Sequence, residues 1–195
     1  MQKLERIRAW SCSSLEEIFE FRRLIVDDEG DATALTIFES ENQGTRINKM
    51  MSFKESRQAF QNLREIDIES CDSLRTLLSP SVARGLVKLQ TLTIENCKRI
   101  EEVLAVPAEG EETEDDNMFP QLRTLELEDL PNLGSFSQGD YNFKWPLVND
   151  IKILKCYNLK TFCLGSLSTP KDVEIEVEGA GESVLQQLNN SRKQI

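Results

Sequence analysis

The chain has 195 residues, which is enough for one substantial domain. Its formal net charge of −11 argues against a nucleic-acid partner, whose phosphates need Lys and Arg, and against an anionic membrane surface. The first residues contain no apolar signal-peptide core, and no run approaches the roughly 20 apolar residues that span a bilayer. We therefore expect a cytoplasmic protein with no nucleic-acid and no membrane partner.

One spacing of apolar residues recurs along the chain. Counted from Leu63 as offset 0, the apolar positions of residues 63–77 fall at offsets 0, 3, 5, 8, 11 and 14. The same spacing starts at Leu4, Leu89, Leu122 and Val148, and it matches the leucine-rich-repeat pattern L-x-x-L-x-L-x-x-N/C-x-L. It predicts an α/β leucine-rich-repeat solenoid, which is a curved arc with a parallel sheet on its concave face and loops and short helices on its convex face.

Residues 1–178 are expected to form this array, as about six to seven repeats. The second repeat is the weakest, because offsets 8, 11 and 14 counted from Ala32 are the polar residues Ser40, Gln43 and Arg46. Its strand pair would be Leu35 and Ile37. The predicted repeat starts are Leu4, Ala32, Leu63, Leu89, Leu122, Val148 and Pro170.

Two features interrupt the middle repeats. Ser79 as N-cap, Pro80 at the first helical position and Gly85 as a stop predict a short helix on the convex side. Residues 109–117 hold six carboxylates, which predicts a solvated loop. A cation site is the alternative there, although the stretch lacks the alternating order of a calcium loop.

The C-terminal part is expected to close the array. Pro170, Val173 and Ile175 fit offsets 0, 3 and 5 of a last half-repeat, with Glu178 at the offset that cysteine occupies elsewhere. Val184, Leu185 and Leu188 lie on one face of a predicted helix. Residues 179–195 are therefore predicted to be a capping helix or tail.

Four of the five cysteines share offset 8 and should stack in a column, one per repeat. A metal site or disulfides would be the functional interpretation, and a small buried side chain in the turn after the strand is the structural one. The chain has no histidine and no C-x-x-C pair, which favours buried thiols and no metal. Reduced thiols agree with a cytosolic compartment.

Side chains alternate along a strand, so offsets 3 and 5 point into the core while offsets 2, 4 and 6 point outward. Across the repeats these outward positions hold ten carboxylates against three basic groups, with the bases mainly at the N-terminal end. They predict a recognition surface for a protein with a basic surface; a charged face that only keeps the array in solution is the alternative. The candidate protein-binding residues are Arg6, Arg8, Trp10, Glu65, Asp67, Glu69, Glu95, Glu126, Glu128 and Lys152.

Catalysis is not expected. Without histidine there is no Ser/His or Cys/His nucleophile pair. A carboxylate pair among Glu65, Asp67, Glu126 and Glu128 could do acid–base chemistry, but an open sheet offers no water-excluding pocket that would raise a carboxyl pKa. We expect no enzyme, no cofactor, no metal and no small-molecule substrate.

Several stretches carry a family resemblance. Residues 60–74 (FQNLREIDIESCDSL), 81–89 (SVARGLVKL), 119–127 (FPQLRTLEL), 145–147 (WPL) and 156–160 (CYNLK) are similar to repeats of plant intracellular nucleotide-binding leucine-rich-repeat disease-resistance proteins, in the class with an N-terminal coiled coil. The resemblance covers about residues 1–165. The chain shows no G-x-x-x-x-G-K-[ST] phosphate loop, so no residue is assigned to nucleotide binding.

The resemblance implies a role in plant innate immunity. In that family the repeats sense a pathogen effector or a modified host protein, and they hold the nucleotide-binding domain in its resting state. The expected partner is therefore an effector, a guarded host protein or an intramolecular nucleotide-binding domain. The alternative is a scaffold built on the same fold, such as a substrate adaptor of a ubiquitin ligase unrelated to immunity.

Overall fold

The computed structural model describes residues 4–12, 34–38, 60–106 and 117–192, with the backbone alone for 34–38. Most of the predicted acidic loop 109–117 and of the segment 21–60 lies outside these residues. In the described ranges no helix is both long enough and apolar enough to cross a membrane.

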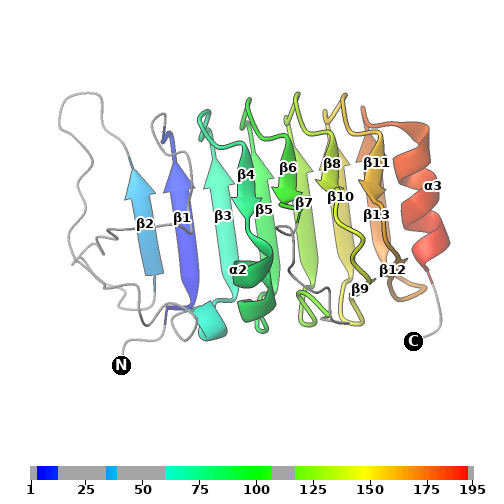
Figure 1. Cartoon of the computed structure of the whole chain (residues 1–195), viewed down its shortest axis with the longest axis horizontal. Helices are drawn as coiled ribbons and strands as arrows, with labels where there is room; N and C mark the ends of the chain where they lie inside the picture. Colours follow the sequence, from blue (N-terminus) through cyan, green and yellow to red (C-terminus); the bar gives the residue numbers. More distant parts are fainter. Residues whose placement is uncertain (1–3, 13–33, 39–59, 107–116, 193–195) are drawn as a thin grey trace.

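Seven parallel strands form the main sheet (Figure 1). Each strand has five residues, and neighbouring strands pair in register from one repeat to the next. The strands are β1 (Arg6–Trp10), β2 (Ala34–Phe38), β3 (Glu65–Glu69), β5 (Thr91–Glu95), β7 (Thr124–Glu128), β10 (Asp150–Leu154) and β13 (Glu174–Glu178). The chain is thus an α/β leucine-rich-repeat solenoid.

The repeat template explains how each main-sheet strand forms and ends. Offsets 3 and 5 in β1, β3, β5, β7 and β10 are fully buried, while offsets 2, 4 and 6 remain partly or fully exposed. The residue after the strand has a left-handed backbone, with φ between 51° and 73° at Ser11, Ser70, Asn96, Asp129, Lys155 and Gly179. At offset 8 the buried cysteine thiol follows, and the Sγ of Cys97 donates to the Glu95 carbonyl at 3.3 Å. The prediction of small buried side chains in this turn is confirmed.

The order of the first strands differs from the order in the chain. A solenoid that follows the sequence would place β2 between β1 and β3, but β1 lies between them and pairs with both. The Ser11 N–H donates to the Glu69 carbonyl and the Arg64 N–H donates to the Glu5 carbonyl, so the repeats at Leu4 and Leu63 are direct neighbours. β2 occupies the outer position beside β1.

The register of the last strand also differs from the prediction. Glu174 pairs with Asp150, and Glu178 pairs with Leu154, so the repeat is counted from residue 172 and not from Pro170. A repeat that starts at Pro170 predicts Asp172, Glu174 and Glu176 as its outward residues, but the observed outward residues are Glu174, Glu176 and Glu178. A shift by two residues keeps the alternation of inward and outward side chains, so the local pattern fits both registers.

The opposite side of the solenoid carries shorter strands. The back sheet consists of β4 (Thr76–Leu78), β6 (Glu102–Leu104), β8 (Ser135–Ser137) and β11 (Thr161–Cys163). A two-stranded sheet joins β9 (Phe143–Lys144) to β12 (Leu167–Ser168), and η2 (Phe60–Asn62) is a short 3-10 helix. The helix predicted after Ser79 is α2 (Pro80–Gly85), and the Ser79 hydroxyl accepts from the Val82 N–H at 3.4 Å.

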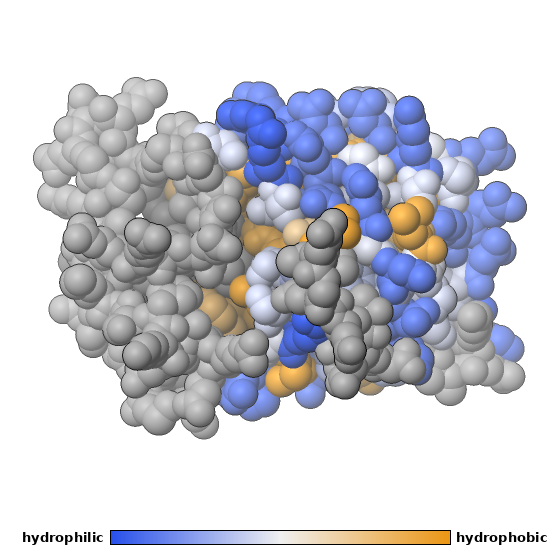
Figure 2. Space-filling view, in the orientation of Figure 1, coloured by the Kyte–Doolittle hydropathy of each residue, from blue (hydrophilic) through white to orange (hydrophobic). Residues whose placement is uncertain are grey.

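The C-terminal helix α3 (Glu182–Ser191) covers the end of the core. Val184 and Leu188 are fully buried, whereas Leu185 is 38% exposed and so does not share their face fully. Gln187 closes the edge of β11: its Oε1 accepts from the Phe162 N–H at 2.7 Å and its Nε2 donates to the Cys163 carbonyl at 3.1 Å. In Figure 2, hydrophilic residues line the edge where the main-sheet strands end, and hydrophobic residues appear in small separate groups.

Candidate protein-binding face

The predicted site residues all lie on the main sheet and share one surface. β1 carries Arg6, Arg8 and Trp10, while β3 carries Glu65, Asp67 and Glu69; the other four come from β5, β7 and β10. We call this surface, made by offsets 2, 4 and 6, the open face. Because the strands pair in register, the side chains form three columns that run across the sheet.

At the N-terminal end of the open face, two arginines pair with Glu65 of β3. The Nε of Arg6 donates to Glu65 Oε2 at 2.9 Å, and the Nη2 of Arg8 donates to Glu65 Oε1 at 2.9 Å. Arg8 Nε also lies 3.6 Å from Asp67 Oδ2, and its guanidinium is 6.0 Å from the centre of the Trp10 ring. Burial raises the pKa of Glu65, but the hydrogen bonds from the two arginines outweigh burial and lower that pKa overall.

These contacts were missed in the sequence because chain order places another strand between the bases and the acids. The direct pairing of β1 with β3 brings Arg6 opposite Glu65 and Arg8 opposite Asp67. The N-terminal bases are therefore partners of the first acids, and not a separate basic patch.

At the C-terminal side, two lysines neutralise β7. Lys152 Nζ lies 2.5 Å from Glu126 Oε1 and 3.9 Å from Glu128 Oε2, while Lys155 Nζ lies 3.0 Å from Glu128 Oε1. The hydrogen bond from Lys155 lowers the pKa of Glu128, and the hydrogen bond to Glu126 raises the pKa of Lys152. Lys155 was not a predicted site residue, because it stands in the turn after β10 and reaches the face only through its long side chain.

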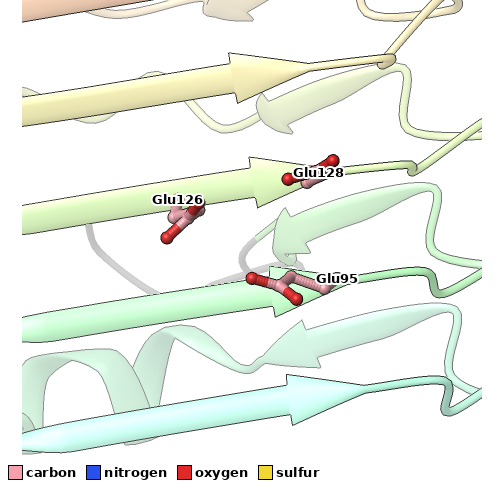
Figure 3. A group of neighbouring side chains, drawn as sticks. All are labelled: Glu95, Glu126 and Glu128. Carbon is pink, nitrogen blue, oxygen red and sulfur yellow. The ribbon is translucent and has the colours of Figure 1, made fainter.

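The centre of the open face keeps its negative charge. Oxygen atoms of Glu95, Glu126 and Glu128 all lie within 4.8 Å of one another, on the adjacent strands β5 and β7 (Figure 3). Glu69 and Glu95 pair in register, and among the described residues neither forms an ion pair. Burial, and then repulsion from Glu126, Glu128, Glu69 and Asp67, raises the pKa of Glu95.

Asp67 belongs to the same central group. Burial raises its pKa, and the attraction of Arg8 is too weak to offset burial and the neighbouring carboxylates. The neutral side chain of Thr93 lies between Asp67 and Glu126 in register, so no charge of the described chain separates them. The central group consists of Asp67, Glu69 and Glu95, and it can attract a cationic group from outside.

A cluster of carboxylate oxygens is the donor set that hard divalent cations prefer. Here the ammonium groups of Lys152 and Lys155 already stand against Glu126 and Glu128, and compete with such an ion for these oxygens. This arrangement suits the positively charged side chains of a protein better than a closed metal cage, because these carboxylates lie on an open sheet.

Comparison with known proteins supports this assignment of fold. The sequence model of the family described as plant disease resistance protein RPS2-like, leucine-rich repeats, matches residues 1–98 and 41–173. No curated protein and no solved structure gave a match. Since the two matches together span most of the chain, the chain belongs to the leucine-rich-repeat family of RPS2-like plant disease-resistance proteins.

Proposed function

We propose that this chain is a recognition module of plant immunity whose open face binds a basic surface of another protein. The partner would be a pathogen effector, a modified host protein or a nucleotide-binding domain that the repeats hold in its resting state. Membership of the disease-resistance family supports a protein-interaction role in resistance. The uncompensated charge of Glu69 and Glu95 is the observation that carries the proposal of a basic partner.

The distribution of ion pairs indicates which carboxylates of the open face a partner would contact. Glu65, Glu126 and Glu128 each have a cation of the chain within 3.0 Å, so their charge is already balanced. A partner's Lys or Arg above Thr93 would meet the central carboxylates instead, and it would relieve their mutual repulsion. Such complementarity speeds association and rejects acidic proteins.

Trp10 gives the same face an aromatic contact. Its side chain remains partly exposed beside Arg8, and Trp and Arg are the residue types that most often dominate interface energetics. We propose binding and not catalysis as the role of the open face, because its carboxylates lie on an open sheet. The five buried thiols support a cytoplasmic setting, where thiols stay reduced.

The test is affinity capture from plant extract with two charge-reversed variants. Glu69→Lys/Glu95→Lys changes the central group without removing an internal ion pair. Asp140→Lys/Asp172→Lys is the matched control, because both side chains are exposed, neither lies on a main-sheet strand, and the change in net charge is the same.

We expect to capture a protein that the wild type and the control both retain. The Glu69→Lys/Glu95→Lys variant should not retain it. Retention should also fall as salt is raised from low to physiological concentration, because exposed charges are screened over about 8–10 Å under those conditions. Equal retention by all three proteins, with no dependence on salt, would show that the open face is not the recognition surface.

A further inference from the structure

The outer edge of β13 differs from the rest of the main sheet. The Glu174 N–H donates to the Asn149 carbonyl at 2.9 Å, and the Glu178 carbonyl accepts from the Lys155 N–H at 2.8 Å. Backbone groups alternate in direction along a parallel strand, so those of Ile175 and Val177 point away from β10. Among the described residues no strand pairs with this edge.

The core is also less well covered at β13. The two inward residues of β1, β3, β5, β7 and β10 are all 0% exposed, whereas Ile175 and Val177 are both partly exposed. The helix α3 contacts β13, but the side-chain hydrogen bonds of Gln187 go to β11 of the back sheet and not to β13. The main sheet therefore ends in an unpaired backbone edge beside two incompletely covered apolar side chains.

The charged side chains of β13 limit which strands can pair with its outer edge. Glu174, Glu176 and Glu178 are exposed and lie on alternate positions of the strand, on the open face. A second copy of β13 would place glutamates against glutamates, which opposes strand pairing. A strand with Lys or Arg at alternate positions would instead meet the glutamates, and its intervening apolar residues would cover Ile175 and Val177.

We propose that the outer edge of β13 is a second docking site, which binds an extended basic segment of another protein as an eighth strand of the main sheet. Main-chain hydrogen bonds to Ile175 and Val177 provide the pairing, and the three glutamates select the partner. This site is separate from the central group of Asp67, Glu69 and Glu95, and it does not depend on the function proposed for the open face.

The experiment measures amide hydrogen exchange of the full chain by NMR with a blocked peptide, Lys-Val-Lys-Val-Lys, as the probe. At nine-tenths occupancy of the edge, the Ile175 and Val177 amides should exchange about tenfold more slowly. The peptide Glu-Val-Glu-Val-Glu should leave both rates unchanged.

Four variants separate strand addition from simple charge attraction. Val177→Pro removes an outward N–H, which an edge strand tolerates, and should abolish the protection of Ile175; Val177→Ala keeps the N–H and should preserve it. Glu176→Lys leaves the backbone unchanged. It should weaken binding of the Lys-Val-Lys-Val-Lys peptide and strengthen binding of the Glu-Val-Glu-Val-Glu peptide. Glu69→Lys/Glu95→Lys should leave the protection at β13 unchanged.

Protection that survives Val177→Pro in a folded protein, or that appears only on β3 to β7, would overturn the proposal. So would protection of Ile175 and Val177 that grows with protein concentration in the absence of peptide, because the occupant would then be a second copy of the chain.

Discussion

The two sheets of the solenoid arise from the same repeat but meet solvent differently. In the main sheet, each of β3, β5, β7 and β10 has a buried inward face and an outward face, and the outward positions are free to hold charged residues. In the back sheet only the first position of β4, β6 and β11 is partly exposed, and β8 is buried throughout. The outward side chains of the main sheet are therefore available to contact a partner, while the side chains of the back sheet mainly pack in the core.

The sheets also end differently at the C-terminal side. Gln187 satisfies the backbone of β11, so the back sheet has a closed edge, whereas the edge of β13 is not paired within the described chain. The difference shows that a single helix caps the core without capping both sheets. The experiments below alter one sheet at a time.

The largest effect is expected at the back sheet, from Phe136→Ala. The Phe136 ring is fully buried and stacks on Phe162 with centroids 4.9 Å apart, and it meets the Trp145 and Phe143 rings edge to face or nearly so. Its removal should cost about 3–5 kcal/mol of unfolding free energy, measured by urea denaturation. Phe136→Leu, the residue type found at Leu77 in an earlier repeat, should cost less.

Leu92→Ala tests the inward side of the main sheet. The side chain is fully buried in β5, so the cavity should cost about 2–5 kcal/mol. Thr93→Ala, on the outward side of the same strand, should stay within about 0.5 kcal/mol. Similar thermal shifts for both variants would contradict the assignment of inward and outward faces.

Gln187→Leu opens the closed edge of the back sheet. It leaves the Phe162 N–H and the Cys163 carbonyl without their partner, which should cost about 1–3 kcal/mol. The neighbouring Gln186 is exposed, so Gln186→Leu is the matched control for added apolar surface. A chemical-denaturation midpoint that is the same for both variants would show that Gln187 does not seal this edge.

The smallest effects concern the open face, where Glu65→Gln and Glu95→Gln should change stability in opposite directions, each by less than about 1 kcal/mol. The pKa of Glu65 is lowered in the folded state, so its contribution is present near neutral pH and is lost as pH falls through that pKa, below the ordinary 4.5. Glu65→Gln should therefore destabilise at pH 7 and have little effect in acid.

Glu95 shows the reverse dependence. Its pKa is raised, so the folded protein binds a proton before the unfolded chain does, and wild-type stability should rise as pH falls from 7 toward that pKa. Glu95→Gln should stabilise at pH 7, and the gain should disappear in acid. Melting temperatures of the three proteins from about pH 7 to about pH 3 cover both trends. If the three curves run parallel, the carboxylates at the centre and at the N-terminal end of the open face do not differ in pKa.

The positions of the strands and the faces of their side chains could be predicted from the sequence, because they depend on local alternation. The inward pair of β5 and the outward carboxylates of β3 lie where the spacing of apolar residues indicates. The helix after Ser79 could likewise be predicted, since its cap and its proline are local signals. Lys155 could not be recognised as part of the open face, because a turn position does not reveal where a long side chain reaches.

The sequence by itself therefore determined the repeat, the strands and the acidic character of the open face, since each depends on residues close together in the chain. The tertiary structure alone decided that β1 adjoins β3, that β13 pairs two residues later than its pattern suggested, and that the cations pair with carboxylates of β3 and β7 but not with Glu69 and Glu95. The physical reason is that alternation has a period of two and fixes which face a side chain occupies, but it does not specify which strand lies alongside. That choice depends on contacts between residues far apart in the chain, and it determines which carboxylates are left for a partner.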